Sequence, residues 1–205
     1  MGVKDTNLYL NEEDIALLAD TGFFTRKKAI TEHVIRLLGE LESELDISIQ
    51  KYRSLLPESV FHKRGKISRG ENYLGLPYVI LDYPAIFEKN GVFAFRTLMW
   101  WGNSFSFTFH LSGHFLERYQ ESILQKIEEL DEDILICINA NPWEHHHRNN
   151  NYIPVKEFLK TTDNNPDYFK NKGFLKLSKI IPLEQHSTLV AEGKEFLTLV
   201  LNHLQ

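Results

Sequence analysis

Acidic and histidine side chains in the middle of this 205-residue chain have the chemistry of metal ligands. Asp82 ends a predicted strand, His110 and His114 flank a strand-to-helix junction, and Glu144 precedes the triplet of residues 145–147. Such side chains bind zinc and related divalent metals. Consecutive histidines on an extended chain point to opposite sides, so at most two of the triplet could reach one ion. One alternative is therefore a metal-dependent hydrolase with zinc or another divalent metal as cofactor, and its candidate ligands are Asp82, His114, Glu144 and His145.

A second group of side chains comes from the alternating run of residues 104–112, which predicts a half-buried strand. Its phenylalanines lie on one face, whereas Ser106, Thr108 and His110 lie on the other. The preceding run is also aromatic, and Gly102-Asn103 between the two runs indicates a hairpin. The polar face also receives one tryptophan. The four residues that we expect to form a wall for a small polar or aromatic ligand are Arg96, Trp100, Thr108 and His110. The alternative is a solvated or helix-covered face without a ligand.

The hairpin register decides which of these side chains are neighbours. A two-residue loop would pair Trp101 with Ser104 and place Arg96 among the phenylalanines, where an unpaired guanidinium is costly. A three-residue loop through Ser104 would pair Trp101 with Phe105 and set Arg96 opposite His110. We expect the second register. The cation would then hold His110 neutral near pH 7 and leave a ring nitrogen free to accept a hydrogen bond.

Several helices and strands must position these residues. A capped helix begins after Asn11 and ends at Gly22, and a long amphipathic helix runs from Thr25 to Leu56, where Pro57 stops it. Glycines in residues 62–71 indicate a loop. The remaining expectations are a strand over Tyr78–Tyr83, a helix capped by Ser112 with Leu116, Tyr119, Ile123, Ile127 and Leu130 facing inward, a strand over Ile134–Ile138, a polar loop over residues 139–152, a helix near Val155–Thr161, a strand near Phe174–Ile181 and a C-terminal helix.

This order of elements predicts an α+β fold with a mixed sheet. The sheet is built on a three-strand antiparallel meander, the long helix precedes it, and later strands alternate with helices. No internal repeat or long linker divides the chain, so residues 1–205 are expected to form a single globular domain.

Composition excludes several classes of protein. The chain is 42% hydrophobic and 25% charged with a formal net charge of −5, which argues against nucleic-acid binding. Cys137 is the only cysteine, so no intramolecular disulfide can form. No segment approaches 18 consecutive apolar residues and the first residues do not resemble a secretory signal, so we predict a cytoplasmic protein without a membrane partner.

Three functions remain open at this level. The first is binding of a small polar or aromatic ligand without a cofactor, the second is the metal-dependent hydrolase, and the third is a protein-interaction adaptor whose aromatic side chains contact a partner. The GxSxG and GxGxxG motifs are absent, so the sequence assigns no enzymatic reaction. The long helix would also suit self-association. Three cations, Arg26, Lys27 and Lys28, oppose the helix dipole at its start, which a bound phosphate or solvation would resolve.

Overall fold

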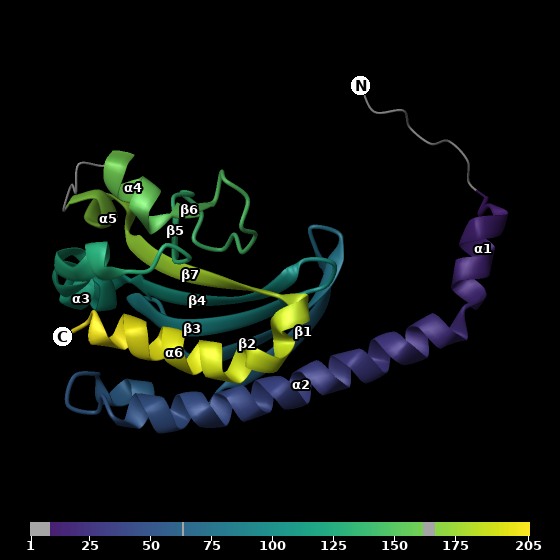
Figure 1. The fold of residues 1–205 in the computed structure, drawn as a ribbon, viewed down its shortest axis with the longest axis horizontal. Coiled ribbons are helices and arrows are strands. Elements are labelled where there is room, and N and C mark those ends of the chain that lie inside the picture. The colour runs from purple at the N-terminus through teal and green to yellow at the C-terminus, as the bar shows by residue number, and fades with distance from the viewer. Residues whose placement is uncertain (1–8, 63, 162–166) are drawn as a thin grey trace.

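A computed structural model describes residues 9–62, 64–161 and 167–205 (Figure 1). The fold is α+β, with a long N-terminal helix, a seven-stranded sheet and further helices between the later strands. The helices are α1 (Glu12–Ala19), α2 (Thr21–Gln50), α3 (Gly113–Lys126), α4 (Val155–Thr161), α5 (Asp167–Lys172) and α6 (Leu189–Asn202), and the 3-10 turns are η1 (Glu58–Phe61), η2 (Ile127–Glu129) and η3 (Leu183–Thr188). The strands are β1 (Lys66–Tyr73), β2 (Leu76–Glu88), β3 (Gly91–Trp100), β4 (Ser104–Ser112), β5 (Leu135–Cys137), β6 (Tyr152–Pro154) and β7 (Phe174–Pro182).

The sheet has the order β1-β2-β3-β4-β7-β5-β6, and every pair of neighbours is antiparallel. The prediction of a mixed sheet is therefore wrong. Strands that alternate with helices suggest parallel crossovers, but here β7 fills the place between β4 and β5 and runs against both of them. The antiparallel meander is confirmed, and it contains four strands because β1 adds to the three that the sequence indicates.

The β3–β4 hairpin differs from the predicted register by two residues. Met99 pairs with Phe105 and Arg96 pairs with Thr108, whereas His110 lies opposite Ala94. The predicted pairings of Trp101 with Phe105 and of Arg96 with His110 are therefore wrong. The prediction of which residues share a face is confirmed, because a shift of two residues preserves the side-chain alternation. The three-residue turn contains residues 101–103 rather than 102–104, and Asn103 N donates to Trp100 O across it.

The first strand of the meander was predicted as a loop. Residues 66–73 form β1 at the sheet edge, where the polar residues Lys66, Arg69 and Glu71 are compatible with a strand paired on one side only. Strand β2 continues through Pro84 to Glu88, with a cis Tyr83–Pro84 bond and a shift of pairing between Asp82 and Ala85. Strand β2 therefore continues beyond Tyr83, where the sequence predicts its end.

One face of the sheet, here called the aromatic face, carries the main core. It includes Phe93 and Phe95 from β3 and Phe107 and Phe109 from β4, all fully buried. Helices α2, α3 and α6 cover this face, and Figure 1 shows α2 and α6 lying side by side beneath the strands. The predicted inward stripe of α3 and η2 is buried as expected. Ser112 occupies the N-cap position of α3, but its hydroxyl accepts from Val92 N instead of capping the helix.

Helix α2 begins four residues earlier and ends six residues earlier than the sequence predicts. Asn11 caps α1 through a reciprocal pair of hydrogen bonds with Asp14. Asp20 ends this helix, two residues before the predicted Gly22, and accepts from Phe23 N to begin α2. No helix within the described residues is both long and apolar enough to cross a membrane.

Candidate functional site

The opposite face of the sheet, here called the polar face, carries a row of polar side chains across four strands. Asp82 of β2 pairs with Arg96 of β3, which pairs with Thr108 of β4, which pairs with Ser178 of β7. In the next row, His110 of β4 lies opposite Lys176 of β7. All except Arg96 are buried. Antiparallel pairing therefore gathers these side chains on one surface, although they come from four separate parts of the chain.

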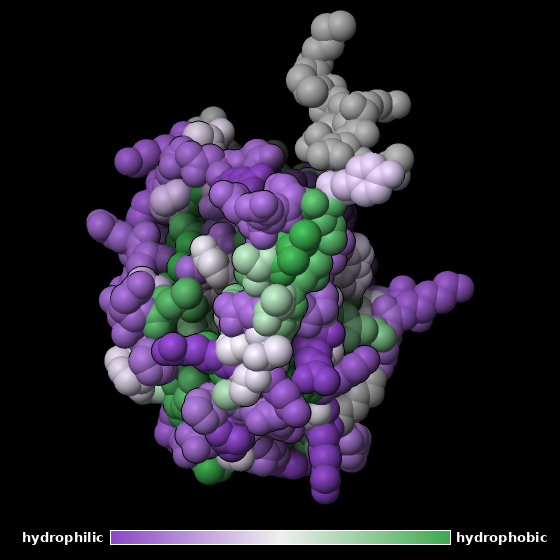
Figure 2. Space-filling view, turned by 90° about the vertical axis from the view of Figure 1, so that its right-hand side faces the viewer, coloured by the Kyte–Doolittle hydropathy of each residue, from purple (hydrophilic) through white to green (hydrophobic). Residues whose placement is uncertain are grey.

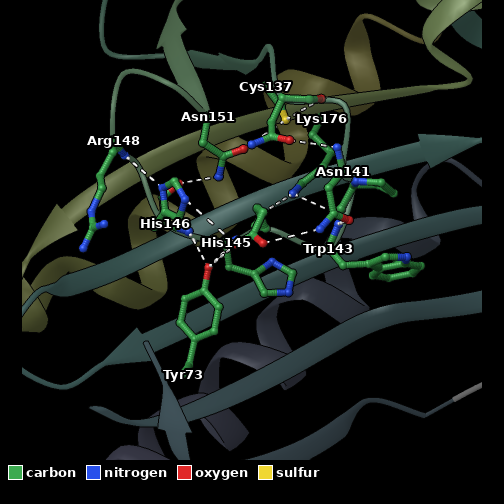
Figure 3. Close-up of polar contacts among 12 residues, drawn as sticks. Tyr73, Cys137, Asn141, Trp143, His145, His146, Arg148, Asn151 and Lys176 are labelled. Atoms are coloured by element: carbon green, nitrogen blue, oxygen red, sulfur yellow. Dashed lines mark hydrogen bonds and ion pairs between the residues drawn. The ribbon is translucent and has the colours of Figure 1, made fainter. Parts of the chain in front are cut away.

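A polar loop, residues 138–151, covers this row in place of a helix (Figure 3). Ile138 N donates to Asn151 O at 2.8 Å and closes the base of the loop. At its centre, the Tyr73 hydroxyl accepts from the backbone N–H groups of His145 and His146 at 2.8 and 3.0 Å and donates to the Glu144 carboxylate at 3.2 Å. Hydrogen bonds to a residue of β1 thus hold the loop over the sheet.

Lys176 also attaches the loop to the sheet. Its side chain is 1% exposed, and Nζ donates to Pro142 O at 3.0 Å and to Glu144 O at 2.7 Å. An ammonium carries three donors, and in the described part of the chain no carboxylate forms an ion pair with this one. Burial lowers the pKa of Lys176 to about 8, with Arg96 contributing in the same direction.

The charge of Arg96 is balanced by a neighbouring carboxylate. Its Nε and Nη2 donate to the two oxygens of Asp82 at 2.7 and 2.9 Å, a bidentate pair. Its Nη1 lies 2.8 Å from His145 Nε2. Because a guanidinium can only donate, His145 accepts at Nε2 and is the neutral Nδ1–H tautomer. Burial and then Arg96 lower the pKa of His145 to about 2.

His147 and Ser178 form a further polar contact of the loop with the sheet. His147 Nε2 lies 2.8 Å from Ser178 Oγ, and this hydroxyl also contacts Phe107 O at 2.5 Å. A carbonyl only accepts, so the serine proton goes to Phe107 O and His147 must donate. Burial lowers the pKa of His147 to about 4, which keeps the ring neutral. The histidine therefore cannot act as a base toward Ser178, which is itself fully buried, and this pair does not support a serine hydrolase.

His110 has the least satisfied environment of the cluster. Its Nε2 is buried and has no hydrogen-bond partner among the described residues. Trp143 of the loop and Phe174 contact the ring edge-on at centroid distances of 5.7 and 5.9 Å. The ring is neutral, as the sequence predicts, since burial lowers the pKa of His110 to about 3. Arg96 contributes through its charge, but burial is the largest cause and Lys176 is the second.

The four predicted wall residues share the polar face but are spread along it. Arg96 and Thr108 lie in one row, and His110 lies in the next. Trp100 lies four residues from Arg96 along β3, roughly 13 Å at strand rise. Its indole is covered by Tyr73 at 5.2 Å, and Nε1 donates to Tyr73 O. The exposed ring above the cluster is Trp143, whose side chain is 51% exposed.

The predicted metal ligands do not converge. Asp82 and His145 both bind Arg96, and Glu144 accepts from Tyr73. His114 follows β4 and contacts Asn90 O. Its neighbour Gly113 pairs with Gly91, which lies five residues before Arg96 on β3. At strand rise this separates His114 from the Asp82–Arg96 pair by roughly 16 Å. Over the described ranges, no group of three or more histidine, cysteine, aspartate or glutamate side chains is arranged to hold a metal ion.

Comparison with known proteins adds no relative. The chain matches no protein family, curated protein or solved structure. The arguments about function therefore rest on the geometry of this molecule.

Four residues that matter here are not among the predicted site residues: Tyr73, Trp143, Lys176 and Ser178. The last two had a signal in the sequence. In the strand over residues 174–181, Leu175 and Leu177 alternate with Lys176 and Ser178, so a lysine and a serine share the face opposite the leucines. Tyr73 gives no such signal, because it directly follows residues 62–71, for which the sequence predicts a loop.

Proposed function

We propose that this chain binds a small molecule carrying an acidic group, at the polar face beneath the loop of residues 138–151. The observation that carries the proposal is the buried ammonium of Lys176, which donates to two backbone carbonyls, lies 5.3 Å from the Tyr152 ring centroid and forms no ion pair with a carboxylate among the described residues. Taking a charge out of water costs several kcal/mol unless a counter-charge or good hydrogen bonds compensate for it. A ligand carboxylate or phosphate would supply that counter-charge by replacing Pro142 O and Glu144 O.

The neighbours of Lys176 favour the same kind of ligand. The charge of Arg96 on this face is balanced by Asp82, so Lys176 carries the charge that would attract an anion. The three adjacent histidines are neutral and supply hydrogen-bonding groups. His110 Nε2 offers one unused polar atom next to Lys176. A buried site with a few convergent polar groups is typical of small-molecule recognition.

The half-exposed Trp143 favours a ligand with a flat ring. Its indole contacts His110 and, at 6.2 Å, Phe87, so a planar molecule entering beneath the loop would meet aromatic surface beside the acidic-group position. Binding requires residues 141–146 to move away from Lys176. We assign no chemical step to the site. In the only serine–histidine contact among the described residues, His147 donates a hydrogen bond to Ser178 and so cannot accept the serine proton.

A thermal-shift experiment tests the proposal with simple probes. Benzoate and phenyl phosphate combine a ring with an acidic group, and benzamide is the matched neutral probe. We expect the two acids to raise the melting temperature of the untagged protein, because a ligand that binds only the folded state stabilises it, whereas benzamide does not.

Two variants locate the effect. Lys176→Met removes the buried charge at similar volume and should abolish the response to both acids. Lys194→Met removes a lysine of α6 that pairs with Glu44 and should keep it. A response retained in Lys176→Met, or no response to either acid in the wild type, would contradict the proposed function.

A further inference from the structure

The N-terminal segment of the described chain extends away from the body as an arm, defined here as residues 10–30. Figure 1 shows α1 and the first turns of α2 projecting beyond the edge of the sheet. No residue of α1 is buried, and the first buried residue of α2 is Val34. The arm therefore owes little of its structure to contacts with the rest of the chain.

The arm nevertheless carries large apolar side chains. Figure 2 views it from its projecting end, with a green apolar strip exposed along it. The exposed apolar side chains are Leu10, Ile15, Leu17, Leu18, Phe23, Phe24 and Ile30, each between 39% and 62% exposed. A contiguous apolar patch of this kind marks a surface that is covered by a partner.

The charges of the arm are separated along its length. Glu12 and Glu13 lie in the first turn of α1, and Arg26 and Lys28 lie in the second turn of α2. Within the part of the chain that the structure describes, none of these four forms an ion pair. The neighbouring Lys27 does, with Glu71 of β1. The acidic end and the basic end are thus both available to a partner.

We propose that the arm pairs with the same arm of a second copy of this chain, antiparallel about a two-fold axis near Asp20. Residues at equal distances from Asp20 then meet: Glu12 faces Lys28, and Leu17 faces Phe23. The eight residues of α1 match the eight residues 21–28 of the partner in length. Because a two-fold interface is self-complementary, every acid-to-base contact occurs twice.

This arrangement also explains why cations begin α2, where they oppose the helix dipole. The acidic first turn of the partner's α1 would neutralise Arg26 and Lys28. The exposed apolar side chains of the two arms would then cover one another. Beyond the apolar strip, Leu10 of the partner would approach an apolar groove of about 390 Å³ at the base of the arm, which Ile30, Val34, Met99, Trp101, Phe105 and Leu183 line.

Sedimentation velocity of the full chain between 1 and 100 μM tests the pairing. We expect a species of about 48 kDa, twice the 24.0 kDa chain. The double variant Leu17→Asp/Phe23→Asp should sediment as a monomer with an unchanged circular dichroism spectrum, because both side chains are exposed. A wild type that stays monomeric at 100 μM, or a dimer that this variant leaves intact, would overturn the proposal.

Charge reversal supplies the matched test. Glu12→Lys and Lys28→Glu should each raise the dimer dissociation constant about tenfold, because each variant homodimer holds two like-charged contacts, whereas an equimolar mixture of the two variants should restore dimers, since both contacts are then attractive. Failure of the mixture to dimerise would overturn the antiparallel arrangement. A monomer that instead co-sediments with phosphatidylglycerol vesicles would assign the arm to a membrane surface and overturn the pairing.

Discussion

The two faces of one sheet are built from the same strands and are buried to similar extents, but their chemistry and their covers differ. On the aromatic face, Phe95 and Phe107 stack at 5.9 Å beneath α6. On the polar face, Arg96 and Thr108 of the same two strands lie beneath a loop rich in asparagine and histidine. A helix covers apolar side chains without further polar contacts. The loop over the polar face is held by specific hydrogen bonds to the sheet, so we expect this face to depend on pH, and the proposed function requires the loop to give way to a ligand.

Lowering the pH should destabilise the polar face, and this is the largest expected effect on the free energy of unfolding. The folded-state pKa values of His110, His145 and His147 lie near 3, 2 and 4, below the value of about 6.5 in an unfolded chain. The unfolded state therefore binds more protons below pH 6.5, and stability falls as the pH falls. Between pH 7 and 5 we expect a loss of about 2 kcal/mol for each histidine, about 6 kcal/mol together.

Urea unfolding at pH 7, 6 and 5 measures this loss. The variant His147→Gln should reduce the pH slope by one proton, whereas His186→Gln, at an exposed position of η3, should leave it unchanged. A wild-type slope of one proton or less would show that the histidines are not buried in their neutral forms.

Truncation on the aromatic face should have the next largest effect. Phe107→Ala removes a fully buried ring that contacts Phe95 and Phe196, and we expect a destabilisation of about 4 kcal/mol from the lost transfer free energy and the cavity. Ser106→Ala, the adjacent residue on the polar face, should cost less than about 1 kcal/mol. Urea unfolding at pH 7 compares the two, and equal losses would remove the distinction between the faces.

Breaking the Asp82–Arg96 pair should cost less than the phenylalanine truncation. Asp82→Asn leaves a largely buried guanidinium without its carboxylate, for an expected loss of about 3 kcal/mol. The double variant Asp82→Leu/Arg96→Met removes both charges and should recover most of that loss. Chemical denaturation at pH 7 again gives the values. If the double variant is less stable than Asp82→Asn, the pair itself stabilises the fold beyond compensating its own burial.

Raising the pH above 8 should stabilise the folded protein through Lys176 on the polar face. Its folded-state pKa of about 8 lies below the ordinary value of 10.5, so the unfolded chain holds more protons in this window and stability rises with pH. From pH 8 to 9.5 we expect a gain of about 2 kcal/mol. Lys176→Met should lose this gain. A flat wild-type profile from denaturant unfolding would place the ammonium in contact with solvent or with a counter-charge.

The spacing of apolar residues in the sequence predicts the buried side chains of the aromatic face correctly. The alternating run of β4 assigns its four core side chains, and the spacing of α3 assigns its buried stripe, because burial against a common core depends on local pattern alone. The C-terminal elements followed for the same reason, with α4 bounded as predicted. Strand β1 was missed because an edge strand pairs on one side only and tolerates a polar sequence.

The polar face was only partly accessible to sequence reasoning. Arg96, Thr108 and His110 were placed on one surface, since alternation requires it. Their cross-strand neighbours depend on register, and a two-residue shift exchanged His110 for Thr108 opposite Arg96. Lys176 and Ser178 lie about seventy residues further along the chain, and only the insertion of β7 beside β4 brings them here. Neither composition nor spacing specifies that long-range pairing.

The most direct test of ligand binding at the polar face is a ¹H–¹⁵N spectrum of the assigned wild-type protein, titrated with benzoate at pH 7. We predict saturable shifts in the backbone amides of residue 141, residues 143–146 and Lys176, with little change in α2 and α6. Shifts confined to other surfaces, or a loop whose amides are unaffected at millimolar benzoate, would contradict the account.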